Sequence, residues 1–161
     1  MAKPLRLTTV NARGLLDIRR SFGPLCERLL SNRIAIALVQ ETHIANPAML
    51  RRLSKFWKGG FYCSYGTNMA RGVAILIDSS LDCKVIKETK DAHGRLLILD
   101  LDIHETKLRI INIYAPNENR PKRAFLESLR EYCDTPRRII IGGDFNTTLD
   151  MTNMENNIKN D

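Results

Sequence analysis

The sequence predicts one compact domain of the α/β class (α/β or α+β), in which strands form most of the layers and helices cover them. The chain has 161 residues, which is enough for one domain and too few for two. Hydrophobic residues make up 43% and charged residues 27%, a balance typical of a globular protein rather than a disordered one. Apolar runs of strand length outnumber segments of helical periodicity, and the two kinds occur in mixed order.

The first part of the chain predicts a strand–helix–strand unit. Leu5 to Val10 is typical of a strand that ends at Asn11. Apolar residues then fall at helical spacing between positions 17 and 30, and the helix is expected to become regular only after Gly23-Pro24. The nearly continuous apolar run 34–39 indicates a strand covered on both faces. Such a unit predicts two parallel strands joined by a right-handed crossover.

The rest of the chain predicts two further helices and six further strands. Asn46-Pro47 is a good helix start, and Ala124 to Tyr132 has the spacing of a short helix. A polar turn at 104–107 is expected to join two of the strands as a hairpin. The expected strands are 61–65, 73–77, 83–87, 95–103, 108–114 and 138–141. We expect the domain to span 1–150 and the polar, aperiodic residues 151–161 to form a disordered tail.

Nothing in the sequence predicts a membrane or secreted protein. No apolar run approaches the roughly 20 residues needed to span a bilayer. The first residues contain no apolar stretch typical of a signal peptide, so we expect an intracellular protein with no membrane partner. The four cysteines are far apart and form no C-x-x-C pair, which favours reduced thiols over a zinc site or a disulfide framework.

The net charge of +7 favours a polyanionic partner, because contacts to phosphates release condensed counterions. The basic residues occur in small groups, and each group alone is more typical of a solvated helix face or loop than of a binding site. Together they make nucleic acid the favoured class of partner. The groups are 19–20, 51–52, 120–123 and 137–138.

The informative polar residues follow apolar strands directly: Asn11, Glu41, Asp144 and Asn146. Strand ends are where side chains can converge on a ligand above a rigid scaffold. Glu41 fits a carboxylate ligand of Mg²⁺, and Asp144 can orient or deprotonate a water or protonate a leaving oxygen. Asp144 and Asn146 are two residues apart, so an extended backbone would direct both to the same side.

Each of these residues also has an ordinary structural interpretation. A glutamate after a strand is usually a surface residue, and Gly-Gly-Asp-x-Asn alone is typical of a turn. Asn11 with Arg13-Gly14, taken alone, is more typical of a turn that ends a strand. The functional interpretation therefore depends on the combination.

Five segments together resemble the motifs of the endonuclease/exonuclease/phosphatase family, and they occur in family order. They are TTVNARGL (8–15), VQETH (39–43), RGVAIL (71–76), IYAPN (113–117) and GGDFN (142–146). The residues in these motifs are most similar to those of the endonucleases of LINE-type retrotransposons and of apurinic endonucleases. The resemblance implies a DNase I-like four-layer α/β sandwich, which we expect to be incomplete at its C-terminal end.

The resemblance also implies a role for each motif residue. Glu41 and Asn11 would bind the catalytic metal, Mg²⁺, for which Mn²⁺ can substitute. Tyr114 would position the scissile phosphate, Asp144 would act on the nucleophile or leaving group, and Asn146 would stabilise the phosphorane. Three more residues in these motifs are expected to contact substrate: Arg13, His43 and Asn117.

The function implied is Mg²⁺-dependent hydrolysis of a DNA phosphodiester by an exodeoxyribonuclease III-like hydrolase. In a retrotransposon such a nick primes reverse transcription, so the expected partners are DNA and, in a longer parent protein, a reverse transcriptase domain. The expected place of action is the nucleus. All of this is carried over from the family.

The sequence departs from the family after Asn146, where no segment matches the family's Ser-Asp-His motif. We therefore expect impaired catalysis, and strands left without cover on one face, with an exposed apolar patch and a marginal fold. Two alternatives stay open: a non-catalytic remnant that binds nucleic acid, and a phosphatase acting on a lipid or small molecule.

Overall fold

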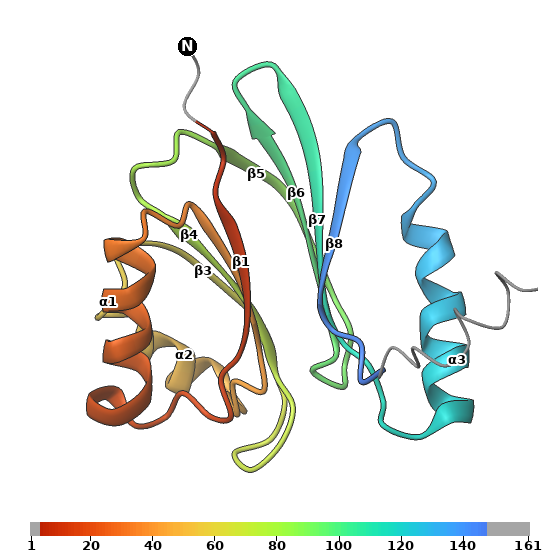
Figure 1. Cartoon of the computed structure of the whole chain (residues 1–161), viewed down its shortest axis with the longest axis horizontal. Coiled ribbons are helices and arrows are strands. Elements are labelled where there is room, and N and C mark those ends of the chain that lie inside the picture. The colour runs from red at the N-terminus through yellow and green to blue at the C-terminus, as the bar shows by residue number, and fades with distance from the viewer. Residues whose placement is uncertain (1–3, 148–161) are drawn as a thin grey trace, which may run out of the picture.

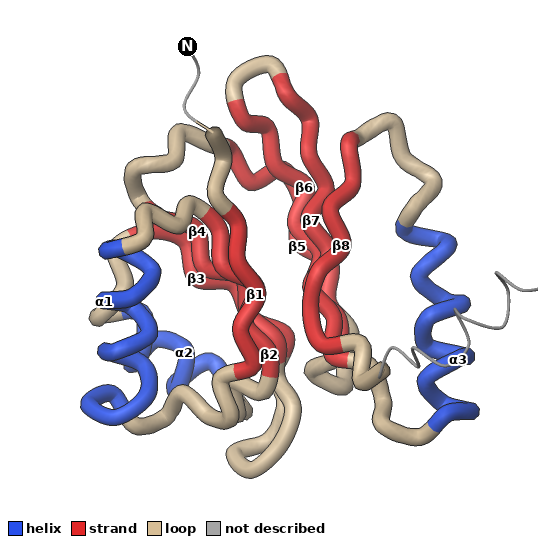
Figure 2. The backbone as a smooth tube through the Cα atoms, in the orientation of Figure 1, coloured by secondary structure: helices blue, strands red, loops and turns tan. Residues whose placement is uncertain are grey.

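The computed structural model describes residues 4–147, which form a four-layer α/β sandwich. Two four-stranded sheets pack face to face, and helices cover their outer faces (Figure 1). Figure 2 shows the two groups of strands between the helices. The predicted fold class is confirmed, whereas the expected tail at 151–161 and the domain boundary at 150 lie outside the described residues. None of the described helices is long and apolar enough to cross a bilayer.

The first sheet contains the predicted strand–helix–strand unit. Its strands lie in the order β1-β2-β4-β3, with β1 and β2 parallel and the other neighbours antiparallel. All five residues of β2 are buried, as predicted for a strand covered on both faces. The bounds are β1 Leu7–Asn11, β2 Ile36–Gln40, β3 Gly59–Ser64 and β4 Val73–Asp78.

Two helices cover this sheet, and both begin where the sequence predicts. A π-helical turn, η1 (Ile18–Phe22), starts after Asp17, whose carboxylate accepts two backbone N–H groups. It leads into the regular helix α1 (Gly23–Ser31) at the Gly-Pro pair. The helix α2 (Pro47–Ser54) is capped by Asn46, whose side chain accepts a backbone N–H at 3.0 Å.

The second sheet has the order β5-β6-β7-β8. β6 and β7 form the predicted hairpin, whereas β7 and β8 are parallel. The helix α3 and the 3₁₀ turn η2 cross between them on the outer face (Figure 1). The bounds are β5 Lys84–Lys90, β6 Leu96–Ile103, β7 Thr106–Tyr114, α3 Asn119–Ser128, η2 Leu129–Tyr132 and β8 Arg138–Asp144.

Four elements of this half of the fold extend beyond their predicted bounds, β5, β7, α3 and β8, and the last two shape the site. α3 begins at Asn119 instead of Ala124, because Pro121 lies in the first turn, where a missing N–H costs no helical hydrogen bond. β8 continues past Ile141 to Asp144, because its two glycines stay paired with β7. Both extensions bring polar side chains closer to the strand ends.

The main core lies between the two sheets. It is built from alternating residues of facing strands and buries the inner faces of β2, β4, β6 and β7, whereas β1, β5 and β8 contain no buried residue. The expectation of an uncovered strand face is therefore wrong for the central strands, because β5–β8 supply the second sheet from within this chain, but on β8 Ile141 remains 39% exposed. The buried residues of this core between the sheets are Ile36, Leu38, Val73, Ile75, Ile77, Leu97, Leu99, Leu101, Leu108 and Ile110.

The glycine pair of β8 sets the position of Asp144. A Cβ on Gly142 would lie 2.6 Å from Cδ1 of Leu38, so the missing side chain lets β8 approach the first sheet. Gly143 has a φ of +140°, and a Cβ there would lie 2.1 Å from the carbonyl oxygen of Ile113. Only glycine fits there without displacing the backbone that leads into Asp144.

Candidate active site

Four strand ends bring four of the predicted site residues together. Asn11 ends β1, Glu41 follows β2, Tyr114 ends β7 and Asp144 ends β8. The amide nitrogen of Asn11 donates to Oε1 of Glu41 at 2.9 Å and to Oδ2 of Asp144 at 3.0 Å. The phenol of Tyr114 donates to the same Oε1 of Glu41 at 3.0 Å. Two side chains from each sheet therefore form one cluster across the junction between the sheets.

The backbone next to this cluster is strained. Non-glycine residues rarely adopt positive φ, and such residues gather at functional sites where neighbouring structure holds them. Backbone hydrogen bonds link three loops here: Gly14 N donates to the Glu41 carbonyl at 2.7 Å, and His43 N donates to the Arg71 carbonyl at 3.0 Å. Four residues of these loops have φ between 50° and 63°: Arg13, Glu41, His43 and Arg71.

Tyr114 is a hydrogen-bond donor at neutral pH. Burial raises the pKa of its phenol above the usual value, and the hydrogen bond to Glu41 and the charge of that carboxylate raise it further. A protonated phenol is what a carboxylate or phosphate oxygen requires as a partner.

A buried polar network lies beneath the cluster and joins the two sheets. Gln40 donates to Oδ1 of Asn112 at 2.8 Å and to Oγ1 of Thr9 at 3.1 Å. Asn112, on β7, donates in turn to the carbonyl oxygens of Val39 at 3.1 Å and Ala74 at 2.7 Å in the first sheet. Sequence reasoning missed these residues, although a polar residue inside an apolar strand was an available signal.

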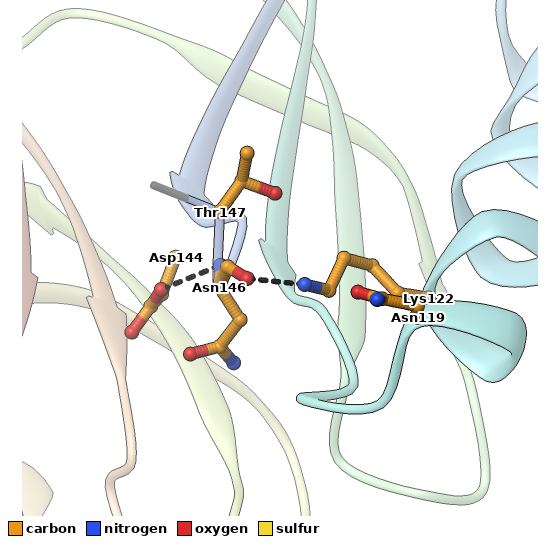
Figure 3. A pocket seen from close by; sticks show the side chains of 5 residues that line it. All are labelled: Asn119, Lys122, Asp144, Asn146 and Thr147. Carbon is orange, nitrogen blue, oxygen red and sulfur yellow. Dashed lines mark hydrogen bonds between the residues drawn. The ribbon is translucent and has the colours of Figure 1, made fainter. Parts of the chain in front are cut away.

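A pocket of about 580 Å³ opens beside Asp144. Figure 3 shows Asp144 and Lys122 on opposite sides of Asn146, with Asn119 next to the lysine. Asn146 N donates to Oδ1 of Asp144 at 2.9 Å, and Lys122 donates to the Asn146 carbonyl at 2.5 Å. Sequence reasoning placed Lys122 only in a basic group and did not single out Asn119 or Thr147. Asn119 and Lys122 line the pocket because α3 begins early, and Thr147 follows β8.

Asn146 lines this pocket in a conformation that differs from the prediction. An extended backbone was expected, but Asn146 has a φ of +46°. Its side-chain nitrogen donates to the carbonyl of Ala115 at 2.6 Å, which fixes the amide against β7. Asp144 and Asn146 do share the pocket, but through a left-handed turn instead of strand alternation.

The three expected substrate contacts lie at different distances from the cluster. The backbone N–H of Arg13 donates to Oδ1 of Asn11 at 3.2 Å, and its side chain is exposed. His43 packs against Gly14, where an added Cβ would lie 3.1 Å from Nδ1. Asn117 is exposed and does not line the pocket beside Asp144, so the structure does not bring it into that pocket.

Glu41 and Asp144 form a donor set that fits Mg²⁺. Within residues 4–147 no group of three His, Cys, Asp or Glu side chains could hold an ion through protein ligands alone. Mg²⁺ commonly binds one or two carboxylates and completes its shell with water and phosphate oxygens. Asn11 was predicted as a metal ligand. Its side-chain nitrogen donates to both carboxylates, and its side-chain oxygen accepts from the backbone N–H of Arg13. In this geometry Asn11 bridges Glu41 and Asp144.

Some known proteins are similar to this chain in sequence, and others are similar to it in fold. A protein of Xenopus laevis described as the Transposon TX1 uncharacterized 149 kDa protein is 32% identical over 149 residues, which are 91% of this chain and 11% of that protein. The D. rerio TDP2 structure complexed with single strand DNA product is 20% identical, with a TM-score of 0.68 over 90% of this chain and 62% of that one.

Two further solved structures share the fold at low sequence identity. An AP endonuclease from Archaeoglobus fulgidus is 23% identical, with a TM-score of 0.58 over 89% of this chain and 58% of its own. A mannosyl-6-phosphatase of Bacteroides thetaiotaomicron is 11% identical, with a TM-score of 0.65 over 91% of this chain and 67% of its own. The chain thus spans about a tenth of the transposon protein and about three fifths to two thirds of these three structures.

The profile of one family covers almost the whole chain. The description of that family is "Endonuclease/Exonuclease/phosphatase family", and the match extends over residues 8–157. The matched region contains Asn11, Glu41, Tyr114, Asp144 and Asn146, the residues that the sequence motifs had singled out. The chain belongs to the Endonuclease/Exonuclease/phosphatase family.

Proposed function

We propose that this chain is a Mg²⁺-dependent DNA endonuclease that nicks DNA as LINE-type retrotransposon endonucleases do, with Mn²⁺ able to replace Mg²⁺. The observation that carries the proposal is the cluster at the sheet junction, where Asn11 bridges Glu41 and Asp144 and Tyr114 donates to Glu41. The transposon relative and the net charge of +7 support nucleic acid as the substrate class.

The proposed reaction is in-line hydrolysis of a phosphodiester. A bound divalent cation supplies Lewis-acid stabilisation of charge on the phosphate. Asp144 is held by Asn11 and by the backbone N–H of Asn146, so its carboxylate is oriented to take a proton from water or return one to the leaving oxygen. Tyr114, whose phenol donates its single hydrogen to Glu41 in the free protein, would redirect that hydrogen to a phosphate oxygen of bound DNA.

Asn146 has one donor left for the substrate. Its amide nitrogen carries two hydrogens, and one of them is used on the carbonyl of Ala115. The other has no partner within residues 4–147, and because Asn146 lines the pocket together with Asp144, it can stabilise a non-bridging oxygen of a phosphate bound there. We further propose a nuclear place of action and a reverse transcriptase domain in a longer parent protein, because the transposon relative is far longer than this chain.

Nicking of supercoiled plasmid in Mg²⁺ tests the proposal. Glu41→Gln and Asp144→Asn should each slow nicking by about a hundredfold or more, since each removes a charge from the cluster. Glu27→Gln is the matched control, because Glu27 is exposed on α1, away from the strand ends. Nicking at the wild-type rate by both variants would exclude these roles.

A second candidate is a nucleic-acid-binding module without catalysis. One observation favours this candidate: no histidine within the described part of the chain is hydrogen-bonded to Glu41 or Asp144. Salt-sensitive DNA binding with no nicking at any Mg²⁺ or Mn²⁺ concentration would establish it. Faster hydrolysis of a soluble phosphomonoester than of DNA would instead favour a phosphatase.

A further inference from the structure

Two arginines are held side by side next to the cluster. The loop that leads into β4 and the loop between β5 and β6 are joined by a hydrogen bond from Gly72 N to the Gly94 carbonyl at 3.0 Å. Arg71 and Arg95 are the residues directly beside this bond. Both loops lie at the same end of the sheets as the ends of β1 and β8 (Figure 2).

The packing of these loops leaves no freedom to separate the two arginines. A Cβ on Gly94 would lie 2.8 Å from Cα of Gly66, and a Cβ on Gly72 would lie 2.4 Å from Oγ1 of Thr42. The Gly72–Gly94 hydrogen bond therefore holds the two backbones together, and each glycine also packs closely against a further neighbour. Arg71 itself has a φ of +63°, a strained conformation that the surrounding hydrogen bonds impose.

Arg95 is anchored on the tyrosine of the cluster. Its Nη1 donates to the Tyr114 carbonyl at 3.0 Å, and its guanidinium carbon lies 5.3 Å from the centre of the Tyr114 ring. The same tyrosine donates its phenol to Glu41. A guanidinium has five N–H donors in a planar fork, so most of those of Arg95 remain for a ligand.

Neither arginine has a carboxylate partner in residues 4–147. Other half-buried arginines do, since Arg109 lies 2.7 Å from Asp100 and Arg137 lies 2.7 Å from Asp102. The nearest acid to Arg95 along the chain, Asp91, instead accepts from Ser64 and from backbone N–H groups. Burial lowers the pKa of Arg95, and repulsion from Arg71 lowers it further.

We propose that Arg71 and Arg95 form a subsite for a second backbone phosphate of the DNA, beside the phosphate that is cleaved. A phosphate matches both the charge and the fork geometry of paired guanidiniums, and it relieves their repulsion. This inference rests on the proposed function. It adds a contact that fixes which phosphate reaches Glu41 and Asp144.

The first test measures binding of duplex DNA in EDTA, so that no turnover is needed. Replacing both arginines, in Arg71→Gln/Arg95→Gln, should reduce the magnitude of the slope of log K against log salt by about one, the value for one phosphate, equally for any sequence. Arg33→Gln is the matched control: Arg33 has a φ of +54° and precedes β2, at the end away from Glu41. An unchanged slope in the double variant, or an equal loss in the control, would overturn the subsite.

The second test locates the phosphate on the wild-type protein. A neutral methylphosphonate is moved one position at a time along a duplex, and at one position it should weaken binding by the wild type but not by Arg71→Gln/Arg95→Gln. A wild-type response at no position, or the same response in the variant, would count against the subsite. If the wild type binds in this way but never nicks, the proposed catalysis fails while the subsite stands.

Discussion

Tyr114 contacts both parts of the site, since its phenol donates to Glu41 and its ring and carbonyl hold Arg95. Tyr114→Phe keeps the ring and removes only the donor. We expect nicking to slow by roughly a hundredfold with little change in DNA binding, as for the loss of one transition-state donor. Single-turnover nicking and binding in EDTA check this, and weaker binding with normal chemistry would contradict it.

The same residue predicts a difference in alkaline stability. The pKa of Tyr114 is higher in the folded state than in the unfolded state. The stability that Tyr114 contributes is therefore complete below its unfolded-state pKa and is lost as pH rises through its folded-state pKa. The free energy of unfolding of the wild type should therefore fall more steeply than that of Tyr114→Phe above about pH 10. Urea unfolding of both proteins at several alkaline pH values measures the difference.

Gly143 is the residue where the backbone constraint is most severe. Gly143→Ala places a Cβ against the carbonyl of Ile113 at positive φ, so we expect a loss of about 1–3 kcal/mol in the free energy of unfolding. Gly60→Ala is the control, because its Cβ would meet the end of the Tyr62 ring, which can move. Equal losses in the two variants would show that strain at Gly143 is not the cause.

At the scale of elements, Asn112 connects a strand of one sheet to two strands of the other. Asn112→Leu removes one acceptor of the Gln40 amide and the donor to two buried carbonyl oxygens, which should cost about 1–3 kcal/mol. Gln40→Leu together with Asn112→Leu should cost less than the two single changes added. Additive losses in this double-mutant cycle would mean that the two side chains act independently.

The elements also show how far the sequence could be interpreted. Strand periodicity located β1 to β8 to within a few residues, and motif order located Glu41 and Asp144, because both signals are local. Lys122 and Asn119 reach the pocket only because α3 starts at Asn119 and β8 continues to Asp144. The left-handed conformation of Asn146 likewise depends on a contact with Ala115, 31 residues away, which no local pattern reveals.

At the scale of the molecule, a buried ion-pair cluster predicts acid sensitivity. The hydrogen bond from Arg109 and the nearby positive charges hold the pKa of Asp100 below its usual range. Its stabilisation is thus present above the ordinary aspartate range and lost as pH falls through the folded pKa. The free energy of unfolding of the wild type should exceed that of Asp100→Asn at neutral pH, and this difference should disappear at acidic pH. Urea unfolding of both proteins measures it, and a difference that stays constant with pH would contradict the prediction.

The site crosses the junction between the two sheets, and this has a consequence for how activity arises. Glu41 stands on one sheet and Tyr114 on the other, and the hydrogen bond from Asn11 to Asp144 closes a loop of 133 residues. Contacts between residues so distant in the chain form late, because closing a long loop costs entropy before any contact compensates it. A folding intermediate in which only one sheet has formed would contain only the site residues of that sheet. Nicking competence should therefore return only with the slowest refolding phase.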